Sequence, residues 1–330
     1  MSYKIILNYE RCTHNFSAMS SCNLCIVNCP KNAIKSIERK IIVDESLCTQ
    51  CGKCMEVCPT EAIIASKPYS SIVEEVKIVN NIAELTCGRE INCIAHVNDS
   101  LIFGILAKGA EKIAINHCKR CPKGVNIDKE KERIKMSFNS EVIFNPKELE
   151  VGIKLLETRT EIELLREYYT TTEVIKREGV KLIRAIPEKR DLLVKSIKKL
   201  KDKDEDKIRK YIKNNFVMKK FDPVKCEYMG TCITLCPTGA LRTDGKGRIY
   251  YRADACVKCR VCIDSCLLKG IENTEVEPEE VLEASYKLIA EYKLKRCVDC
   301  GTLFVARDKN DKYCRYCKNY DEELKRYFNS

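Results

Sequence analysis

The chain of 330 residues has a formal net charge of +11, 45% hydrophobic residues, 23 cysteines, 3 histidines and no tryptophan. Its cysteines lie in tight groups with two- and three-residue gaps, as in metal sites, whereas disulfide frameworks are typical of short secreted chains. The N-terminus lacks the apolar segment of a signal peptide, and the longest apolar run, residues 101–107, is too short to span a bilayer. We therefore expect a cytoplasmic protein without a membrane span.

One run of cysteines sets the pattern for the first part of the chain. It has the form C-x2-C-x2-C-x3-C-P and consists of Cys48, Cys51, Cys54, Cys58 and Pro59. The run resembles that of bacterial two-cluster ferredoxins, where the fourth cysteine ligates the other [4Fe-4S] cluster. Cys12, Cys22, Cys25 and Cys29 form a second, altered copy, so we interpret residues 1–66 as a dicluster ferredoxin domain. We expect its strands near residues 3–8 and 41–44.

Crossed ligation, as this resemblance implies, divides these cysteines into two sites. Site I comprises Cys12, Cys22, Cys25 and Cys58. Site II comprises Cys29, Cys48, Cys51 and Cys54. Residues 13–21 form a nine-residue insert where the ordinary run has two residues, and we expect a surface loop that contacts a partner or shields the cluster. His14 in this insert is an alternative ligand, although site I already has four cysteines.

Residues 67–145 are expected to form a small α/β domain. Apolar residues at helical spacing predict a helix over residues 97–110, and residues 112–116 have the pattern of a strand. A strand–helix–strand unit brings the carboxyl ends of parallel strands together. We therefore expect a middle site, for a cluster or zinc, made of Cys87, Cys93, Cys118 and Cys121. The alternative is that only Cys118 and Cys121 pair and the other two belong to the core.

Three short segments of this region carry a further resemblance. They are Cys87-Gly-Arg89, Ile105-Leu-Ala-Lys-Gly-Ala110 and Cys118-Lys-Arg-Cys121. They resemble the second half of the iron–sulfur (delta) subunit of hydrogenases that partner heterodisulfide reductase. This resemblance implies a cluster that relays electrons.

Residues 146–221 are expected to form a helical module or spacer, because apolar residues recur at helical spacing over 149–169 and 192–200. The charged residues 201–207 are typical of a solvated helix–helix turn. Lys195, Lys198 and Lys199 form a basic face that we interpret as solvated rather than as a docking face for an acidic partner.

Residues 222–272 resemble a second ferredoxin domain with one ligand changed. Site III comprises Cys236, Cys256, Cys259 and Cys262. Site IV comprises only Cys226, Cys232 and Cys266, because Met229 occupies the second cysteine position. A thioether is a weak ligand beside a thiolate. We expect site IV to hold a [3Fe-4S] cluster, with a labile four-iron cluster or no cluster as alternatives.

Residues 273–330 begin with an expected helix over residues 278–289, with proline at its first position. They continue with a C-x2-C…C-x2-C pattern that is typical of a zinc ribbon. This ribbon site comprises Cys297, Cys300, Cys314 and Cys317. A single rubredoxin-like iron is the alternative metal.

The charge of +11 suggests nucleic acid at first, but it counts every cysteine as neutral. Six occupied sites at ~−2 each would add ~−12 and bring the protein near neutrality. Nucleic acid is therefore an unlikely partner.

Across the whole chain, the cysteine runs resemble polyferredoxin-type subunits of redox enzymes. The sequence contains no P-loop, no G-x-G-x-x-G turn and no C-x3-C-x2-C run. We expect an α+β protein with two dicluster ferredoxin-like domains flanking a small α/β domain and a helical module, followed by the zinc ribbon. Its expected function is electron transfer between redox protein partners and a catalytic subunit, as in a formate dehydrogenase, hydrogenase or heterodisulfide reductase-like complex. The alternative is a redox-sensing or metalloenzyme assembly protein.

Overall fold

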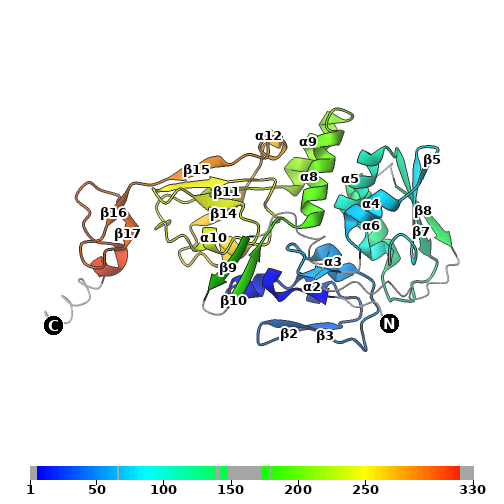
Figure 1. Ribbon diagram of the computed structural model, residues 1–330, viewed down its shortest axis with the longest axis horizontal. Helices are drawn as coiled ribbons and strands as arrows, with labels where there is room; N and C mark the ends of the chain where they lie inside the picture. The colour runs from blue at the N-terminus through cyan, green and yellow to red at the C-terminus, as the bar shows by residue number, and fades with distance from the viewer. Residues whose placement is uncertain (1–5, 65–66, 139–141, 148–172, 178–179, 320–330) are drawn as a thin grey trace.

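The computed structural model shows a mixed α/β chain with several small sheets. It describes residues 6–64, 67–138, 142–147, 173–177 and 180–319. The helical pattern expected over residues 149–169 lies outside these residues. Figure 1 shows an elongated arrangement in which the four-stranded sheet β5–β8 and the β16–β17 hairpin lie at opposite ends. The N-terminal cysteine-rich segment lies between them, and so do residues 218–274.

The N-terminal segment consists of short strands around two cysteine-bearing helices. β1 (Ile6–Leu7) pairs antiparallel with β4 (Ile63–Ile64), and β2 (Ile34–Ile37) pairs with β3 (Lys40–Val43). The strand expected at residues 41–44 is therefore confirmed as β3. The helices carry the cysteine runs, and they are α2 (Leu24–Val27) and α3 (Lys53–Val57). η1 (Tyr9–Arg11) and α1 (Thr13–Phe16) precede them.

Residues 218–274 repeat this pairing pattern. β11 (Met218–Phe221) pairs with β14 (Ile271–Thr274), so the two ends of the segment lie together as in the first copy. β12 (Leu241–Thr243) pairs with β13 (Arg248–Tyr251), which corresponds to the β2–β3 hairpin. The short helices α10 (Thr231–Thr234) and α11 (Val261–Asp264) again carry cysteines, Cys232 and Cys262.

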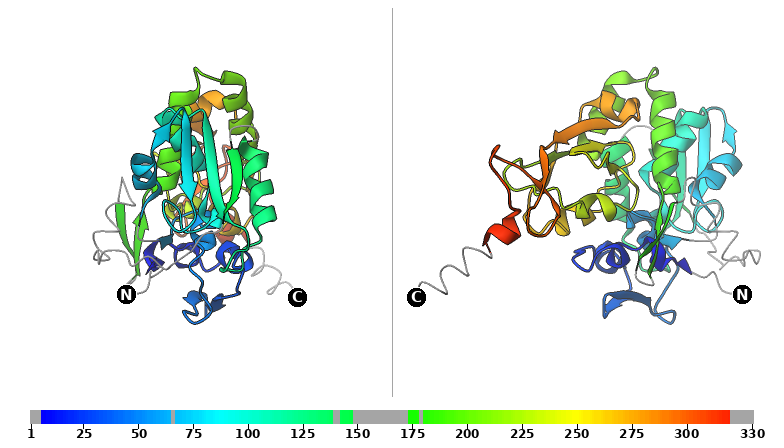
Figure 2. Two further views of the ribbon diagram at one scale, coloured as in Figure 1. Left: turned by 90° about the vertical axis from the view of Figure 1, so that its right-hand side faces the viewer. Right: turned by 60° about the vertical axis from the view of Figure 1, so that its left-hand side comes forward.

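The four-stranded sheet has the order β5-β6-β7-β8 and is shown nearly face-on in Figure 2, left. β6 (Ile82–Thr86), β7 (Lys112–Cys118) and β8 (Val142–Lys147) are parallel, and β5 (Ile78–Val79) is antiparallel to β6. The connecting helices are α5 (Asp99–Lys108) and α6 (Ile127–Phe138), with α4 (Tyr69–Glu75) before the sheet and η2 (Ile94–His96) before α5. The expected helix and second strand are confirmed. The Asn98 side chain fixes the start of α5 by accepting from the Leu101 amide at 2.9 Å.

The segment expected to be wholly helical is not. α8 (Glu188–Leu200) and α9 (Glu205–Asn215) are present, with the charged turn between them as expected. They are preceded by an antiparallel hairpin of β9 (Glu173–Arg177) and β10 (Val180–Arg184). Paired strands satisfy each other's backbone groups, and both strands are rich in the β-branched residues valine and isoleucine, which favour extended backbone. α8 buries Leu193, Val194 and Ile197 in the same core as α5.

The expected helix over residues 278–289 is also corrected. α12 (Pro278–Leu282) ends early, and Ala284 has a left-handed φ of 53°. β15 (Lys287–Glu291) then adds to β13 as a third strand. The hairpin of β16 (Leu294–Arg296) and β17 (Leu303–Val305) follows, and residues 315–319 form a short helical turn. Within the described part of the chain, no helix combines the length and apolar character needed to cross a membrane.

Candidate cluster sites

Sites I and II each surround a separate cavity. All four site I cysteines line one cavity of about 360 Å³, and all four site II cysteines line another of about 310 Å³. Site I takes Cys58 from the second run along the chain, and site II takes Cys29 from the first run. The structure therefore gathers the same crossed sets that the ferredoxin resemblance implies.

The thiols of each set are close enough to oppose one another's ionisation. Burial, followed by the neighbouring Cys58 and Cys22, raises the pKa of Cys25 to about 12. Burial also raises the pKa of Cys51, with a contribution from Cys29 across the two runs. A cationic centre is needed to hold such sulfurs together as thiolates, and iron in a cluster supplies that charge.

The cysteine before each turn accepts a backbone hydrogen bond at its sulfur. The amides of Ala33, Ala62 and Gly270 lie 3.2, 3.3 and 3.2 Å from the Sγ atoms of Cys29, Cys58 and Cys266. In each case the preceding residue has a left-handed φ, 51° at Asn32, Glu61 and Lys269, and this turns the amide toward the sulfur. Hydrogen bonds to sulfur are among the terms that set cluster reduction potentials.

The insert after Cys12, expected to be a surface loop that contacts a partner or shields the cluster, is exposed over only part of its length. Part of it is α1, and Phe16 and Ser17 are buried against residues of the second cysteine-rich segment. The Nε2 atom of His14 lies 2.6 Å from the Cys22 carbonyl oxygen, so this nitrogen is occupied by the backbone.

The middle site forms where β6 and β7 end. Cys87 follows β6, Cys118 ends β7, and the Sγ atoms of Cys93 and Cys121 lie 3.9 Å apart. The contact with Cys121 lowers the pKa of Cys93, but the contact with Cys87 and burial outweigh it and raise this pKa to about 12. Proximity to Cys121, after burial, raises the pKa of Cys118. The alternative in which Cys118 and Cys121 pair alone leaves the Cys93–Cys121 contact unexplained.

Lys123 ties the middle site to site II. Its Nζ atom lies 3.3 Å from the carbonyl oxygens of both Gln50 and Asn92, and its own carbonyl accepts from the Thr49 hydroxyl at 3.0 Å. Its charge partly offsets the burial that raises the pKa values of Cys51 and Cys118. The positive charge of Lys123 therefore acts on both sites, and its contacts join the loops that carry them.

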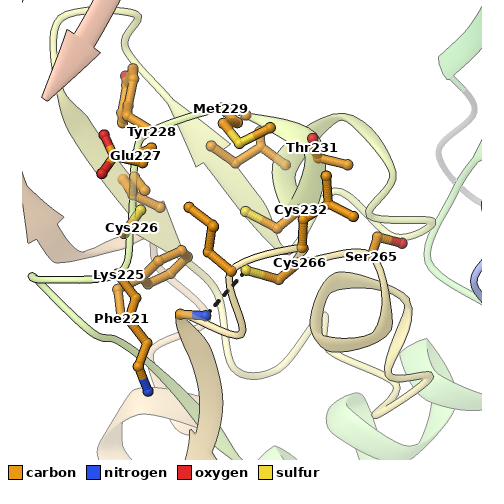
Figure 3. Close-up of a pocket in the computed structure, with 16 residues that line it drawn as sticks. Phe221, Lys225, Cys226, Glu227, Tyr228, Met229, Thr231, Cys232, Ser265 and Cys266 are labelled. Carbon is orange, nitrogen blue, oxygen red and sulfur yellow. Dashed lines mark hydrogen bonds between the residues drawn. The ribbon is translucent and has the colours of Figure 1, made fainter. Parts of the chain in front are cut away.

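Sites III and IV lie close together in residues 226–266. Burial, followed by Cys236, Cys256 and Cys262, raises the pKa of Cys259, so the site III thiols lie together. The three site IV cysteines line a cavity of about 500 Å³, shown in Figure 3. Met229 lines the same cavity but is 48% exposed, and its Sδ atom accepts from the Tyr316 hydroxyl at 3.8 Å.

The ribbon site is much tighter than the others. Its four Sγ atoms all lie within 4.8 Å of one another, and those of Cys300 and Cys314 are 3.7 Å apart. A zinc ion with bonds of ~2.3 Å to sulfur requires tetrahedral edges of ~3.8 Å. Backbone amides, including that of Cys314 at 3.3 Å, lower the pKa of Cys297 to about 6. Among the described residues no other such group of three or more ligands is this compact, which fits a single ion here and larger centres elsewhere.

The segment that carries the ribbon site, residues 294–319 and called the ribbon below, contacts site IV directly. Arg307 donates to the Pro223 carbonyl at 2.6 Å and to the Glu227 carboxylate at 2.8 Å, on either side of Cys226. With the Tyr316–Met229 contact, this places the ribbon over the three-cysteine cavity.

Several residues near the sites carry no signal in the sequence. Lys123 sits in an ordinary basic segment, and Phe16 resembles any apolar loop residue. Arg11 is fully buried beside Cys12, although arginine is rarely so. The carboxylates of Glu61 and Glu188 are buried next to each other near Cys58. Only the fold brings out these roles, because each partner is distant in sequence.

Comparison with known proteins identifies one part of the chain. Residues 41–64 match the model of the 4Fe-4S binding domain family, and this segment contains Cys48, Cys51, Cys54 and Cys58. The match supports a [4Fe-4S] cluster and an iron–sulfur electron-transfer function. No solved structure matches the chain at the level required for similarity.

Proposed function

We propose that this chain is an iron–sulfur electron-transfer subunit that relays single electrons within a multisubunit oxidoreductase. The observation that carries the proposal is the gathering of sites I and II around separate cavities, with one cysteine of site I and three of site II supplied by residues 41–64, the segment that matches the 4Fe-4S family. Bound clusters would supply one-electron chemistry, and the chain's cysteines and amides would hold and tune them.

The proposed cofactors follow from the ligand sets. Sites I, II and III would each hold a [4Fe-4S] cluster, and the middle site a further cluster. Site IV, with Met229 in place of a cysteine, would hold a [3Fe-4S] cluster, and the ribbon site would hold zinc. The proposed partners are a redox protein and a catalytic subunit of the formate dehydrogenase, hydrogenase or heterodisulfide reductase type.

Metal analysis after anaerobic purification tests this proposal. We expect at least about twelve irons per chain, with matching sulfide, from the three complete four-iron sites. A Cys54→Ser variant should lose about four irons and keep zinc, whereas Cys300→Ser should lose zinc and keep iron. Iron well below twelve in the unaltered protein would refute the cluster count.

A second candidate function has one specific observation in its favour. The ribbon contacts both Met229 and the loop around Cys226 through Tyr316 and Arg307, so a change at site IV would reach the ribbon surface. A redox-sensing or assembly protein would use such a contact. A relay subunit should co-purify with a large cofactor-bearing subunit and reduce it. A sensor should instead be isolated alone and change its partner binding on oxidation.

A further inference from the structure

The insert between Cys12 and Cys22 packs against the second cysteine-rich segment. Phe16, which is 3% exposed, forms a small buried apolar group with Val261, and Leu235 and Cys259 pack against this group. Phe16 lies at the end of α1, which begins directly after Cys12. The insert therefore reaches from a site I cysteine to the surroundings of a site III cysteine.

A second contact runs from the other end of the insert. The amide and hydroxyl of Ser21, next to Cys22, donate to one Asp264 carboxylate oxygen at 2.9 and 2.7 Å. Asp264 is 9% exposed and belongs to α11, which carries Cys262. The buried hydroxyls of Ser17, in the insert, and Ser265, directly after α11, lie 2.6 Å apart and add a second polar contact. The insert is thus attached at two points to the second cysteine-rich segment, once beside Cys259 and once beside Cys262.

Residues 183–185 hold the same two segments from another side. Arg11, adjacent to Cys12, donates to the Thr60 carbonyl and to the carbonyls of Ile183 and Ala185 at 3.1 and 2.8 Å. The next residue, Arg184, donates to the Cys236 carbonyl at 3.1 Å, and the Ala185 amide donates to Pro237 at 3.0 Å. A buried arginine with several carbonyl partners fixes its surroundings strongly. The separation of sites I and III is therefore set by buried contacts.

We propose that residues 12–22 form an internal bridge that couples site I to site III, so that the two cysteine-rich segments conduct electrons as one unit. This inference rests on the proposed function. In one transfer, the centre at one site loses an electron and the centre at the other gains it, and no bond or proton moves. The electrons come from an external low-potential one-electron donor. The bridge is short: the α1 turn between Cys12 and Phe16 rises about 6 Å.

The bridge also gives the sites an order. Lys123 joins the middle site to site II, and sites I and II share the crossed cysteine runs. The insert joins site I to site III, which shares its crossed runs with site IV. The order is middle site, II, I, III, IV, and Figure 1 shows β7, then α3 and α2, and then α10 in this sequence along the molecule. The middle site and site IV are the two ends, where external partners would exchange electrons.

The test is the magnetic interaction between reduced clusters, measured by EPR on the full chain reduced anaerobically with dithionite. Cys22→Ser should disrupt the cluster at site I, and Cys259→Ser the cluster at site III. A magnetic interaction that disappears in both variants is therefore the one between sites I and III. Phe16→Ala should weaken that interaction, because the other contacts between the segments remain, and leave the one between sites I and II unchanged. Phe16→Leu, which keeps the apolar contact, should retain it. Met19→Ala is the matched control, because Met19 is an exposed apolar residue of the same insert.

Asp264→Asn provides an independent variant that preserves side-chain size and should weaken the same interaction even if Phe16→Ala does not fold. Normal cluster reduction with the site I–site III interaction unchanged in both variants would overturn the bridge and leave the proposed function intact. If the unaltered protein contained no reducible clusters, both the bridge and the proposed function would be rejected.

Discussion

Met229 is the residue that distinguishes the second cysteine-rich segment from the first. It lines the site IV cavity with three cysteines, but it is half exposed and its sulfur is held by Tyr316. A neutral thioether turned toward the ribbon is a poor fourth ligand for iron. A cluster bound at site IV would therefore have one corner without a protein ligand.

Replacing this methionine tests that interpretation. Met229→Cys should add about one iron per chain and remove a three-iron EPR signal, because a fourth thiolate completes the site. Met136→Cys, at an exposed position on α6, is the control for an added thiol and should change neither quantity. Equal iron and an unaltered spectrum in Met229→Cys would contradict the role assigned to Met229.

Arg11 supports the junction through geometry that lysine cannot reproduce. Its guanidinium contacts the carbonyls of Thr60, Ile183 and Ala185 from a fully buried position. Arg11→Lys should lower the free energy of unfolding by about 2 kcal/mol, because some buried carbonyls lose their donor. Anaerobic thermal unfolding measures this, with the exposed Arg39→Lys as matched control. Equal stability of the two variants would exclude the structural role of Arg11.

At the scale of elements, two helices begin at acceptors supplied by other parts of the chain. The Glu61 carboxylate accepts from the amides of Glu188 and Lys189 at 2.6 and 3.0 Å, at the start of α8. The Glu188 carboxylate accepts from the amides of Tyr69 and Ser70 at 3.3 and 2.7 Å, at the start of α4. These caps connect α8 and α4 to the turn after Cys58.

The capping pair predicts a pH dependence of stability. Burial, followed by the charge of Glu61, raises the pKa of Glu188 from 4.5 to about 7. Between these pH values the folded protein keeps a proton that the unfolded chain has released. The associated stability is therefore complete below about pH 4.5 and is lost as the pH rises through about 7, a change of about 3 kcal/mol.

Glu188→Gln should remove this part of the pH dependence because glutamine does not ionise, although its single side-chain oxygen replaces only one of the two oxygens that accept from the Tyr69 and Ser70 amides. Unfolding midpoints at pH 5 and pH 8 measure it, with Glu74→Gln on α4 as an exposed control for the lost charge. A variant with the same pH profile as the unaltered protein would contradict the assignment.

Local pattern predicted some elements and failed at others for identifiable reasons. The helix over α5 and the strand β7 follow from periodicity together with the cap at Asn98. The helix expected through Ile289 was wrong because Leu288 and Ile289 fit either period, and β13 offers a strand partner that local sequence does not reveal. β9 and β10 were missed although they pair with each other, because the adjacent apolar pairs Val174–Ile175 and Leu182–Ile183 interrupt the alternation typical of a strand.

At the scale of the whole molecule, the resemblance to two-cluster ferredoxins implied which thiols share a cavity at sites I, II and IV. Short gaps bring together the cysteines of one run, but the crossing of Cys29, Cys58 and Cys266 to the other run was implied by the resemblance alone. The contacts between sites could not be predicted. Phe16 and Val261, or Thr49 and Lys123, meet only because the intervening chain folds as it does. Tertiary contacts of this kind leave no periodic trace in a single sequence.

The metal bound at the ribbon site should be removable without loss of iron from the other sites. Cys317→Ser should lower the zinc content by about one per chain and leave iron unchanged, because the four ribbon sulfurs lie close enough together for a single ion. Metal analysis of the purified full chain measures both quantities. Loss of iron instead of zinc would support the rubredoxin-like alternative.

The central claim is that one chain carries several one-electron centres. Anaerobic coulometric reduction of the purified full chain, followed by EPR, tests this most directly. The account predicts uptake of at least about three electrons per chain, one for each complete four-iron site. Uptake of one electron or none by iron-replete protein would contradict it.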